Sequence, residues 1–302
     1  MIIWGIDLGG TKVEGAVLDT AHPEKPLARL RHPTESHLGY DHIVRQIARV
    51  VADLEKQTGL RRPSAIGVGT PGTTEPSTGA MKNCNTTALN GRRLRDDLSS
   101  ELGVEARLAN DANCFALAEA TLGVARGRQV VMGLILGTGV GGGIVVNGRV
   151  LNGCHGIAGE WGHNPIMGEH HPCYCGRAGC VETVIAGPSL ERYYHALTGR
   201  KLSLREIVVQ AEAGDAAAAG TLERLRAKFG ESIAAVINIL DPDAIVIGGG
   251  VGNLDLLYTE ATRSAVVRHL FNPEVRTEFL KPELGDSAGV FGAAMLTGGK
   301  AD

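Results

Sequence analysis

Short apolar runs that end at a carboxylate or at glycine recur along this chain. The first run, Ile2–Ile6, leads through Asp7 into a glycine turn at residues 8–12, and a second apolar run follows at residues 13–19. A buried run, a tight turn and a returning run predict a β-hairpin. The same order begins again at Val130, where an apolar run, a glycine turn and a returning run follow one another. This repeat predicts two related halves.

Other stretches carry the apolar spacing of helices. Ile43, Ile47, Val50, Val51 and Leu54 recur every three or four positions and predict an amphipathic helix that stops at Gly59. Strands interleaved with helices predict an α/β fold. We expect further helices at residues 92–102, 112–122, 188–240 and 288–296, and further strands at residues 65–68, 106–109 and 244–247.

Length and charge narrow the function classes. At 302 residues a single core is near its useful size, so we expect two domains with a cleft between them. A net charge of −3 argues against a nucleic-acid module and against attachment to an anionic membrane. No apolar run reaches the ~20 residues that span a bilayer, and Asp7 interrupts the N-terminal run too early for a signal peptide. We therefore expect a cytoplasmic protein.

Glycine is over-represented, at 42 of 302 residues, and the excess lies in short runs after expected strands. Glycine lets backbone N–H groups approach phosphate oxygens, a threonine in the run adds a hydroxyl donor, and Lys12 can add a positive charge. Tight hairpins also need glycine, and none of these runs is a P-loop or a Rossmann fingerprint. Together they predict a nucleotide site. The runs are Gly9-Gly10-Thr11, Gly137-Thr138-Gly139 and Gly248-Gly249-Gly250.

Two aspartates end expected strands. Asp7 and Asp111 stand where a lone carboxylate usually caps a helix or forms a turn. The pair Asn110-Asp111 offers more, because a fixed Asp111 can accept the proton of an attacking hydroxyl while Asn110 hydrogen-bonds the same substrate. Asp7, beside the first glycine run, is a candidate ligand of Mg²⁺ through water.

A cluster of soft ligands follows. Cys173, Cys175 and Cys180 lie on one glycine-bent loop, shortly after His163. Three thiols and one imidazole can complete a tetrahedron around zinc, and a site with no open position is structural. Three reduced surface thiols without a metal are less favoured, because neighbouring thiols oxidise. The fourth ligand stays open at this point, since three further histidines lie close in sequence: His155, His170 and His171.

Two glutamates flank the cluster. Glu160 precedes His163 by three residues, and Glu182 follows Cys180 by two. Glutamate is ordinarily solvated at the surface. Beside an ordered metal loop, however, both carboxylates can point into a sugar site and accept hydrogen bonds from vicinal hydroxyls.

These segments, in this order and over essentially the whole chain, resemble the ROK family (repressors, open reading frames and kinases). The Cys-x-Cys-Gly-x-x-Gly-Cys-x-Glu element at residues 173–182 is especially specific. The other matching segments are Asp7-Leu-Gly-Gly-Thr-Lys12, Leu108-Ala-Asn-Asp-Ala-Asn113, Leu136-Gly-Thr-Gly-Val-Gly-Gly-Gly143, Glu160-Trp-Gly-His163 and Asp241-Pro-Asp-Ala-Ile-Val-Ile-Gly-Gly-Gly250.

The resemblance implies the actin/hexokinase/Hsp70-like (ribonuclease H-like) fold, with a nucleotide and sugar cleft between two α/β domains. We expect a small domain at residues 1–118, with the last helix (about 288–302) packing back on it. A larger domain at residues 119–287 would carry the zinc loop. Family members are commonly dimers, so the resemblance also favours a homodimer.

The resemblance further implies phosphoryl transfer from MgATP to a hexose hydroxyl, with O6 the expected acceptor. Asp111 would be the catalytic base, and the three glycine runs with Lys12 would line ATP near Asp7 and its Mg²⁺. His163 would serve both sugar and zinc, one ring nitrogen for each. The expected sugar-binding residues are Gly72, Asn83, Asn110, Asp111, Glu160, His163 and Glu182.

Three other functions are less favoured. ROK repressors carry an added N-terminal helix-turn-helix domain, for which we expect no room because Asp7 lies close to residue 1. A sugar sensor without activity would lose the base, whereas Asp111 and Lys12 are both present. An Hsp70-like ATPase would need a peptide-binding domain, for which we expect no remaining chain.

The sequence constrains the identity of the preferred sugar less than it constrains the reaction. The loop Asn83–Gly91 and the segments His163-Asn-Pro and Pro172-Cys-Tyr-Cys resemble bacterial fructokinases and mannokinases of the family. Residues 132–143 look equally like N-acetylglucosamine kinases, but that segment is expected to face ATP. We therefore predict fructose or mannose as acceptor, with N-acetylglucosamine or glucose as the alternative.

Overall fold

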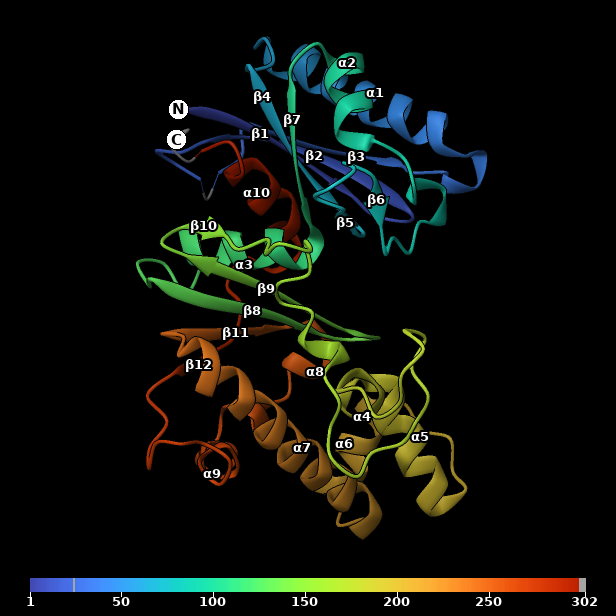
Figure 1. Ribbon diagram of the computed structural model, residues 1–302, viewed down its shortest axis with the longest axis vertical. Helices are drawn as coiled ribbons and strands as arrows, with labels where there is room; N and C mark the ends of the chain where they lie inside the picture. The colour runs from blue at the N-terminus through green and yellow to red at the C-terminus, as the bar shows by residue number, and fades with distance from the viewer. Residues whose placement is uncertain (24, 299–302) are drawn as a thin grey trace. The chain divides into compact units, whose positions relative to one another are not determined.

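The computed structural model describes residues 1–23 and 25–298 of the chain (Figure 1). These residues form two compact units. The first consists of residues 1–23, 25–127, 143–158 and 283–298, and the second of residues 128–142 and 159–282. This division differs from the expected boundary at residues 118 and 119, because residue 118 lies inside a helix, α3 (Asp111–Thr121), that belongs entirely to the first unit.

The first unit is built on a five-stranded sheet of order β3-β2-β1-β4-β7. The expected hairpin is present, with β1 antiparallel to β2 and β2 antiparallel to β3, while β1, β4 and β7 run parallel. The register pairs Asp7 with Gly69 and Thr70 with Asn110, so the strand ends that carry both aspartates lie at one edge. The strands are β1 (Ile2–Leu8), β2 (Lys12–Asp19), β3 (Ala28–Pro33), β4 (Ala65–Thr70) and β7 (Glu105–Asn110).

Helices cover both faces of this sheet. On one face α1 (Tyr40–Thr58) buries its predicted apolar stripe against β2 and β3, next to α2 (Leu94–Leu102). On the other, α10 (Ala288–Met295) lies against β1, β4 and α3, as Figure 1 shows in dark red. Glycines permit this approach, because a Cβ at Gly67 would lie 1.7 Å from the Ala293 carbonyl oxygen. The helix expected over 288–302 thus ends at Met295, and residues 299–302 lie outside the described chain.

Short elements complete the first unit near the edge with the aspartates. They are a small hairpin and three single 3₁₀ turns. Their bounds are β5 (Thr73–Thr74), β6 (Met81–Lys82), η1 (Ser36–Leu38), η2 (Thr87–Leu89) and η5 (Gly285–Ser287).

The second sheet has the order β10-β9-β8-β11-β12, and β11 is parallel to both of its neighbours, β8 and β12. It repeats the predicted strand, glycine turn and returning strand in β8 and β9. Its strands are β8 (Val130–Leu136), β9 (Val140–Val146), β10 (Arg149–Val150), β11 (Ala244–Gly248) and β12 (Glu278–Leu280).

The second unit buries a core around α7, the long helix in Figure 1. Phe229 on α7 packs edge-to-face against Trp161, at 6.3 Å between ring centroids, and against Phe279, at 5.9 Å. The indole N–H of Trp161 donates to the Ser232 carbonyl at 3.1 Å, which ties the loop before His163 to this helix. The helices are α4 (Glu182–Ile185), α5 (Gly187–Thr198), α6 (Leu204–Glu212), α7 (Ala216–Leu240), α8 (Gly249–Gly252) and α9 (Glu260–Val267), with 3₁₀ turns η3 (Trp161–His163) and η4 (Asp255–Tyr258).

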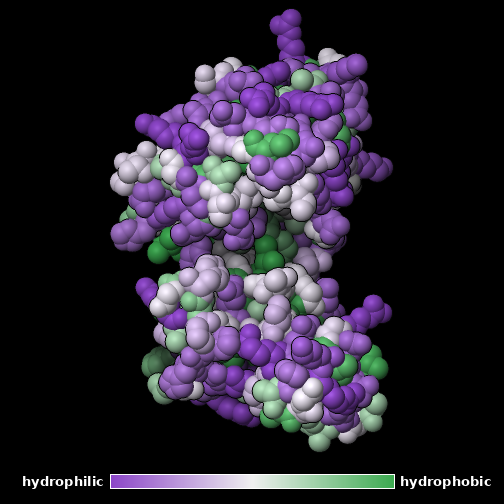
Figure 2. Space-filling view, turned by 90° about the vertical axis from the view of Figure 1, so that its right-hand side faces the viewer, coloured by the Kyte–Doolittle hydropathy of each residue, from purple (hydrophilic) through white to green (hydrophobic). Residues whose placement is uncertain are grey.

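Strands interleaved with helices in both units confirm the predicted α/β class. The face of the molecule drawn in Figure 2 is mainly hydrophilic, with hydrophobic residues in small groups. Among the described residues, every helix is too short or too polar to cross a membrane.

Candidate active site

Asp7 and Asp111 stand at the carboxyl ends of parallel strands, where α/β sheets commonly bind ligands. Asp111 is the first residue of α3, and one of its carboxylate oxygens accepts a hydrogen bond from the Ala112 N–H at 2.8 Å. Asn110 caps the same helix, because its side-chain oxygen accepts from the Asn113 N–H at 2.7 Å. The cap fixes the start of α3 and with it the Asp111 carboxylate.

The two aspartates line one cavity of about 560 Å³ within the first unit. Gly9 and Gly10 of the first glycine run line it too. The turn is closed by the Gly9 N–H, which donates to the Lys12 carbonyl at 2.9 Å. The first unit therefore combines two carboxylates and a glycine turn in one hollow.

Burial is the largest cause of the pKa shifts of the two aspartates in this cavity. Burial first, and then the neighbouring carboxylates of Asp111 and Glu14, raise the pKa of Asp7 to about 6 against the opposing charges of Lys12 and Arg31. The Asp111 carboxyl is reachable by solvent, yet the concave wall displaces most of its water and raises its pKa as well. A raised pKa suits a general base, since the carboxylate is then a better proton acceptor.

Three cationic side chains of the first unit gather around Glu14. Glu14 is buried on β2, where it is paired with Arg29 and accepts from Arg31 at 2.7 Å. The Lys12 ammonium lies 3.6 Å from the same carboxylate and remains 44% exposed, so it can still reach a phosphate. Neither Thr11 nor Lys12 lines the cavity in this structure.

Three predicted sugar residues do not line this cavity: Gly72, Asn83 and Asn110. Gly72 packs closely on Cys84, because a Cβ at Gly72 would lie 2.4 Å from that sulfur. Asn83 is exposed and has a left-handed backbone, with φ of 56°. Asn110 is used as the helix cap.

Other residues line the cavity instead. Four of them, at residues 85–88, belong to the loop Asn83–Gly91 that the sequence related to the sugar, although only Asn83 of this loop was a predicted sugar ligand. The additional lining residues are Leu8, Ser36, His37, Pro71, Asn85, Thr86, Thr87 and Ala88.

A second cavity, of about 740 Å³, lies within the second unit. Gly137, Thr138 and Gly250 line it, so the structure brings parts of the second and third glycine runs together. Gly139, Gly248 and Gly249 are not in the lining. Gly249 has a structural requirement instead, with φ of 83° and the Leu136 carbonyl oxygen 2.3 Å from where a Cβ would lie.

The rest of this second lining comes from α5, α6 and the end of α8. Val209 on α6 is apolar yet 54% exposed, an exposure that the structure shows and that no sequence pattern indicated. The further lining residues are Gly187, Pro188, Glu191, Ser203, Leu204, Arg205, Val208, Val209, Glu212, Val251, Asn253 and Leu254.

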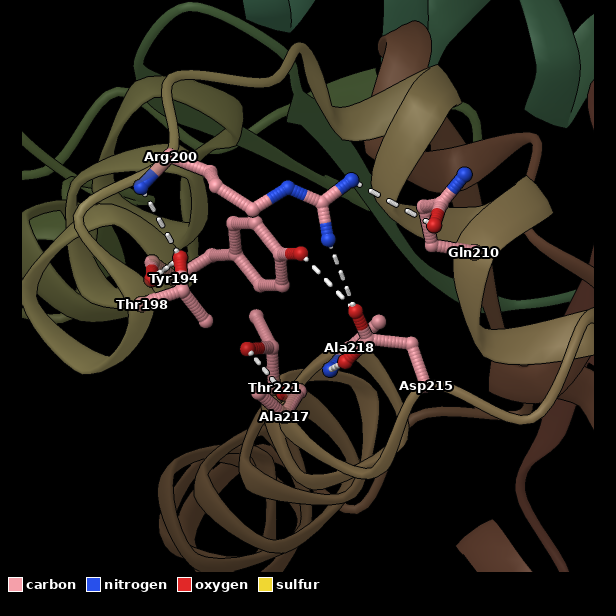
Figure 3. Close-up of polar contacts among 8 residues, drawn as sticks. All are labelled: Tyr194, Thr198, Arg200, Gln210, Asp215, Ala217, Ala218 and Thr221. Carbon is pink, nitrogen blue, oxygen red and sulfur yellow. Dashed lines mark hydrogen bonds and ion pairs between the residues drawn. The ribbon is translucent and has the colours of Figure 1, made fainter.

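A polar clasp holds the helices that form this cavity (Figure 3). Asp215 caps α7 by accepting from the Ala218 N–H at 2.9 Å, and it also accepts from the Tyr194 hydroxyl at 3.0 Å and from Arg200 at 3.1 Å. These bonds keep the pKa of Asp215 below its usual value, the backbone bond first among them. Because Tyr194 lies on α5, the clasp joins α5 to α7 and fixes the cavity wall.

The predicted metal ligands meet in the second unit. One ligand atom from each of His163, Cys173, Cys175 and Cys180 lies within 4.8 Å of the other three. His163 Nδ1 is 3.6 Å from Cys173 Sγ, and the Cys175 and Cys180 sulfurs are 3.6 Å apart. Among the described residues, no other histidine joins this cluster. Three sulfur donors and one imidazole nitrogen match the donor set of a closed zinc site.

The other face of His163 carries the polar groups expected to meet a sugar. His163 Nε2 lies 3.0 Å from the Tyr174 hydroxyl and 4.0 Å from Glu160. Glu182 begins α4 and accepts from the Val140 N–H at 3.0 Å. Partial desolvation of the phenol by the surrounding loop, followed by the nearby carboxylates of Glu182 and Glu160, raises the pKa of Tyr174 to about 12, although most of the side-chain surface is exposed. The structure thus gathers His163, Glu160 and Glu182, together with a tyrosine that the sequence did not single out.

Comparisons with known proteins agree with these features. The model of the ROK family matches residues 3–300. An N-acetyl-D-glucosamine kinase from Pasteurella multocida is 36% identical over 97% of this chain and 98% of its own.

Two solved structures share the fold. The ROK hexokinase from Thermus thermophilus aligns with a TM-score of 0.87 at 34% identity, covering 98% of this chain and 97% of its own. A ROK family glucokinase from Streptomyces griseus, solved with glucose and AMPPNP, aligns with a TM-score of 0.75 at 27% identity, covering 98% and 99%. These similarities confirm the predicted sugar-kinase fold, and they show that the chain belongs to the ROK family.

Proposed function

We propose that this protein phosphorylates a hexose at O6 with MgATP, and that N-acetylglucosamine is its preferred acceptor. The chain is an ATP-dependent sugar kinase of the ROK family, in line with its kinase relatives. The observation that carries the reaction is the pairing of Asp111 and Asp7 beside the glycine turn of one cavity. The observation that favours the sugar is the group of N-acetyl-D-glucosamine kinases at 34–36% identity along nearly the whole chain.

Asp111 is the proposed base. Its carboxylate takes the proton of the sugar O6 hydroxyl as that oxygen attacks the γ-phosphorus of ATP, the bond from this phosphorus to the β–γ bridging oxygen breaks, and ADP leaves. The helix cap at Asn110 supports this role because it fixes the carboxylate before the substrate arrives. Asp7 would hold Mg²⁺ through water. When bound, the ion would neutralise charge on the β- and γ-phosphates.

The second unit supplies the other proposed contacts. Gly137, Thr138 and Gly250, with α6, would hold the nucleotide. Glu160, His163 and Glu182 would bind sugar hydroxyls. The cluster of His163, Cys173, Cys175 and Cys180 would hold a structural zinc ion, whose role is to order the loop that carries these groups.

Fructose and mannose form a second candidate acceptor class. The observation in their favour is the loop Asn83–Gly91 with the His163-Asn-Pro segment, which resembles fructokinases and mannokinases of the family. The named relatives weigh toward N-acetylglucosamine instead. The homodimer and the cytoplasmic location stay predictions.

The test is ADP release with MgATP and four acceptors: N-acetylglucosamine, glucose, mannose and fructose. We expect turnover, with the highest kcat/KM for N-acetylglucosamine. A clear preference for fructose or mannose would overturn the proposed sugar and keep the kinase. No turnover with any of the four, in protein that holds one zinc ion per chain, would contradict the kinase reaction with these sugars.

A further inference from the structure

We propose that the hydroxyl of Tyr174 occupies, in the sugar-free protein, the hydrogen-bonding position at His163 Nε2 that a sugar hydroxyl takes up. Sugar binding then requires the Tyr174 side chain to move away from His163. The inference rests on the proposed function, because it takes His163 as a ligand of the sugar. It adds a residue that sets sugar affinity without taking part in the chemistry.

The geometry places the phenol directly on the substrate face of the imidazole. The Tyr174 hydroxyl is 3.0 Å from His163 Nε2, within hydrogen-bonding distance. The two rings meet edge-to-face, with centroids 5.2 Å apart and planes at 86°. Tyr174 reaches this position because it stands between Cys173 and Cys175 on the loop that turns back toward His163.

The other ring nitrogen, Nδ1, explains why His163 Nε2 binds either the Tyr174 hydroxyl or a sugar hydroxyl, but not both. His163 Nδ1 faces the cysteine cluster, with Cys173 Sγ at 3.6 Å. An imidazole that presents the lone pair of Nδ1 to a metal carries its hydrogen on Nε2. That single N–H donates to one good acceptor at a time, so the Tyr174 oxygen and a sugar oxygen compete for it.

Little else holds Tyr174 in place. The residue is 80% exposed, so its departure from His163 gives up little buried apolar area. Tyr194 shows the contrast within the same unit, since it is fully buried and its hydroxyl donates to Asp215 at 3.0 Å. A tyrosine that is tethered mainly by one hydrogen bond suits a group that a ligand displaces.

The test compares Tyr174→Phe with the wild-type enzyme in sugar binding by calorimetry and in steady-state kinetics. Removal of the hydroxyl leaves the His163 N–H without its protein acceptor, and water replaces that bond in part. We therefore expect the sugar Kd and KM to fall about two- to five-fold, the size of one partly solvated hydrogen bond. We expect kcat and the zinc content to stay unchanged, because Tyr174 has left before the reaction.

Tyr193→Phe is the matched control. Tyr193 lies in the same unit, where its ring stacks under Arg224, and it lines neither cavity. We expect its sugar Kd to equal that of the wild type. The change at Tyr174 must therefore come from the hydroxyl at His163.

Two results would overturn the inference. A weaker sugar Kd in Tyr174→Phe would make Tyr174 a direct sugar ligand, and an unchanged Kd would leave its hydroxyl without a role in binding. Failure of the proposed function is a separate observation, because the wild-type protein itself would then bind none of the sugars.

Discussion

The two units hold their reactive groups in place by different means. In the first, Asp7 and Asp111 are positioned by strand register and a helix cap, and burial raises the pKa of each, with the Asp111 charge a smaller contribution at Asp7. In the second, His163 and three cysteines lie on irregular chain, where complementary donors converge on one point. A site on regular structure survives the loss of a charge, whereas a site on a loop depends on its ligands for its shape.

The largest expected effect is the loss of turnover when the proposed base, Asp111, is replaced and the fold of the first unit is kept. Asp111→Asn keeps the helix-cap geometry but loses the proton acceptor, so kcat should fall by about 10²- to 10⁴-fold. The measurement is steady-state ADP release, with circular dichroism to show that the fold is intact. Asp96→Asn changes a half-exposed residue of α2 that lines neither cavity; it is the control and should keep full activity. Activity of Asp111→Asn close to that of the wild type would exclude Asp111 as base.

The next effect concerns the loop of the second unit. Cys180→Ser should lower the zinc content from one ion per chain and raise the sugar KM by about ten-fold or more, because the loop that carries His163 loses its cross-link. Cys154→Ser changes an exposed cysteine outside the cluster and should leave both values unchanged. Elemental analysis and kinetics measure the two variants. Protein that is purified without chelator and contains no zinc would contradict the metal site.

Asp7→Asn tests whether the negative charge of Asp7 lowers the stability of the folded protein. The folded state raises the pKa of Asp7 from 3.8 to about 6, so folding favours the protonated carboxyl, and stability falls as the pH rises through this interval. Asparagine stays neutral, and the variant should therefore gain about 2 kcal/mol in the free energy of unfolding at pH 8.

At pH 3 this gain should disappear, because Asp7 is then protonated in both states. Urea titrations of both proteins at the two pH values measure the difference. Activity should be lost at both, since Asp7 is the proposed partner of Mg²⁺. A less stable variant at pH 8 would show that the Asp7 charge stabilises the fold.

The smallest effect concerns the anchor of the metal loop. Trp161→Phe removes the N–H that donates to the Ser232 carbonyl, whereas Trp4→Phe removes an N–H that has no partner among the described residues. Both changes leave a similar cavity in a core. We expect Trp161→Phe to cost about 1 kcal/mol more in the free energy of unfolding. Equal losses would mean that the hydrogen bond does not hold the loop.

The sequence predicted the parts that regular periodicity or ligand spacing determines. The apolar run before Asp7 and the stripe from Ile43 to Leu54 placed β1 and α1. The spacing of the cysteines predicted the three thiols that meet, whereas the fourth ligand was left open by spacing and is His163 in the structure. In both cases a local pattern carries the information.

The cavity-lining residues that the sequence did not predict depend on the path that each loop takes in the folded chain. Asn85 and His37 line the first cavity because separate turns bring them to the strand edge, and no periodicity encodes that meeting. Val209 lines the second cavity because α6 lies beside α5, a packing that Arg200 supports by donating to Asp215 and to Gln210 of α6. The contact of Tyr174 with His163 likewise follows from the fold of the loop.

The most direct test of the account is the identity of the product formed from MgATP and N-acetylglucosamine. Phosphorus and carbon NMR of the reaction mixture would show which oxygen carries the phosphoryl group. The account predicts N-acetylglucosamine 6-phosphate in amounts equal to the ADP released. ADP release with free inorganic phosphate and no sugar phosphate would contradict it, because Asp111 would then be activating water and not a sugar hydroxyl.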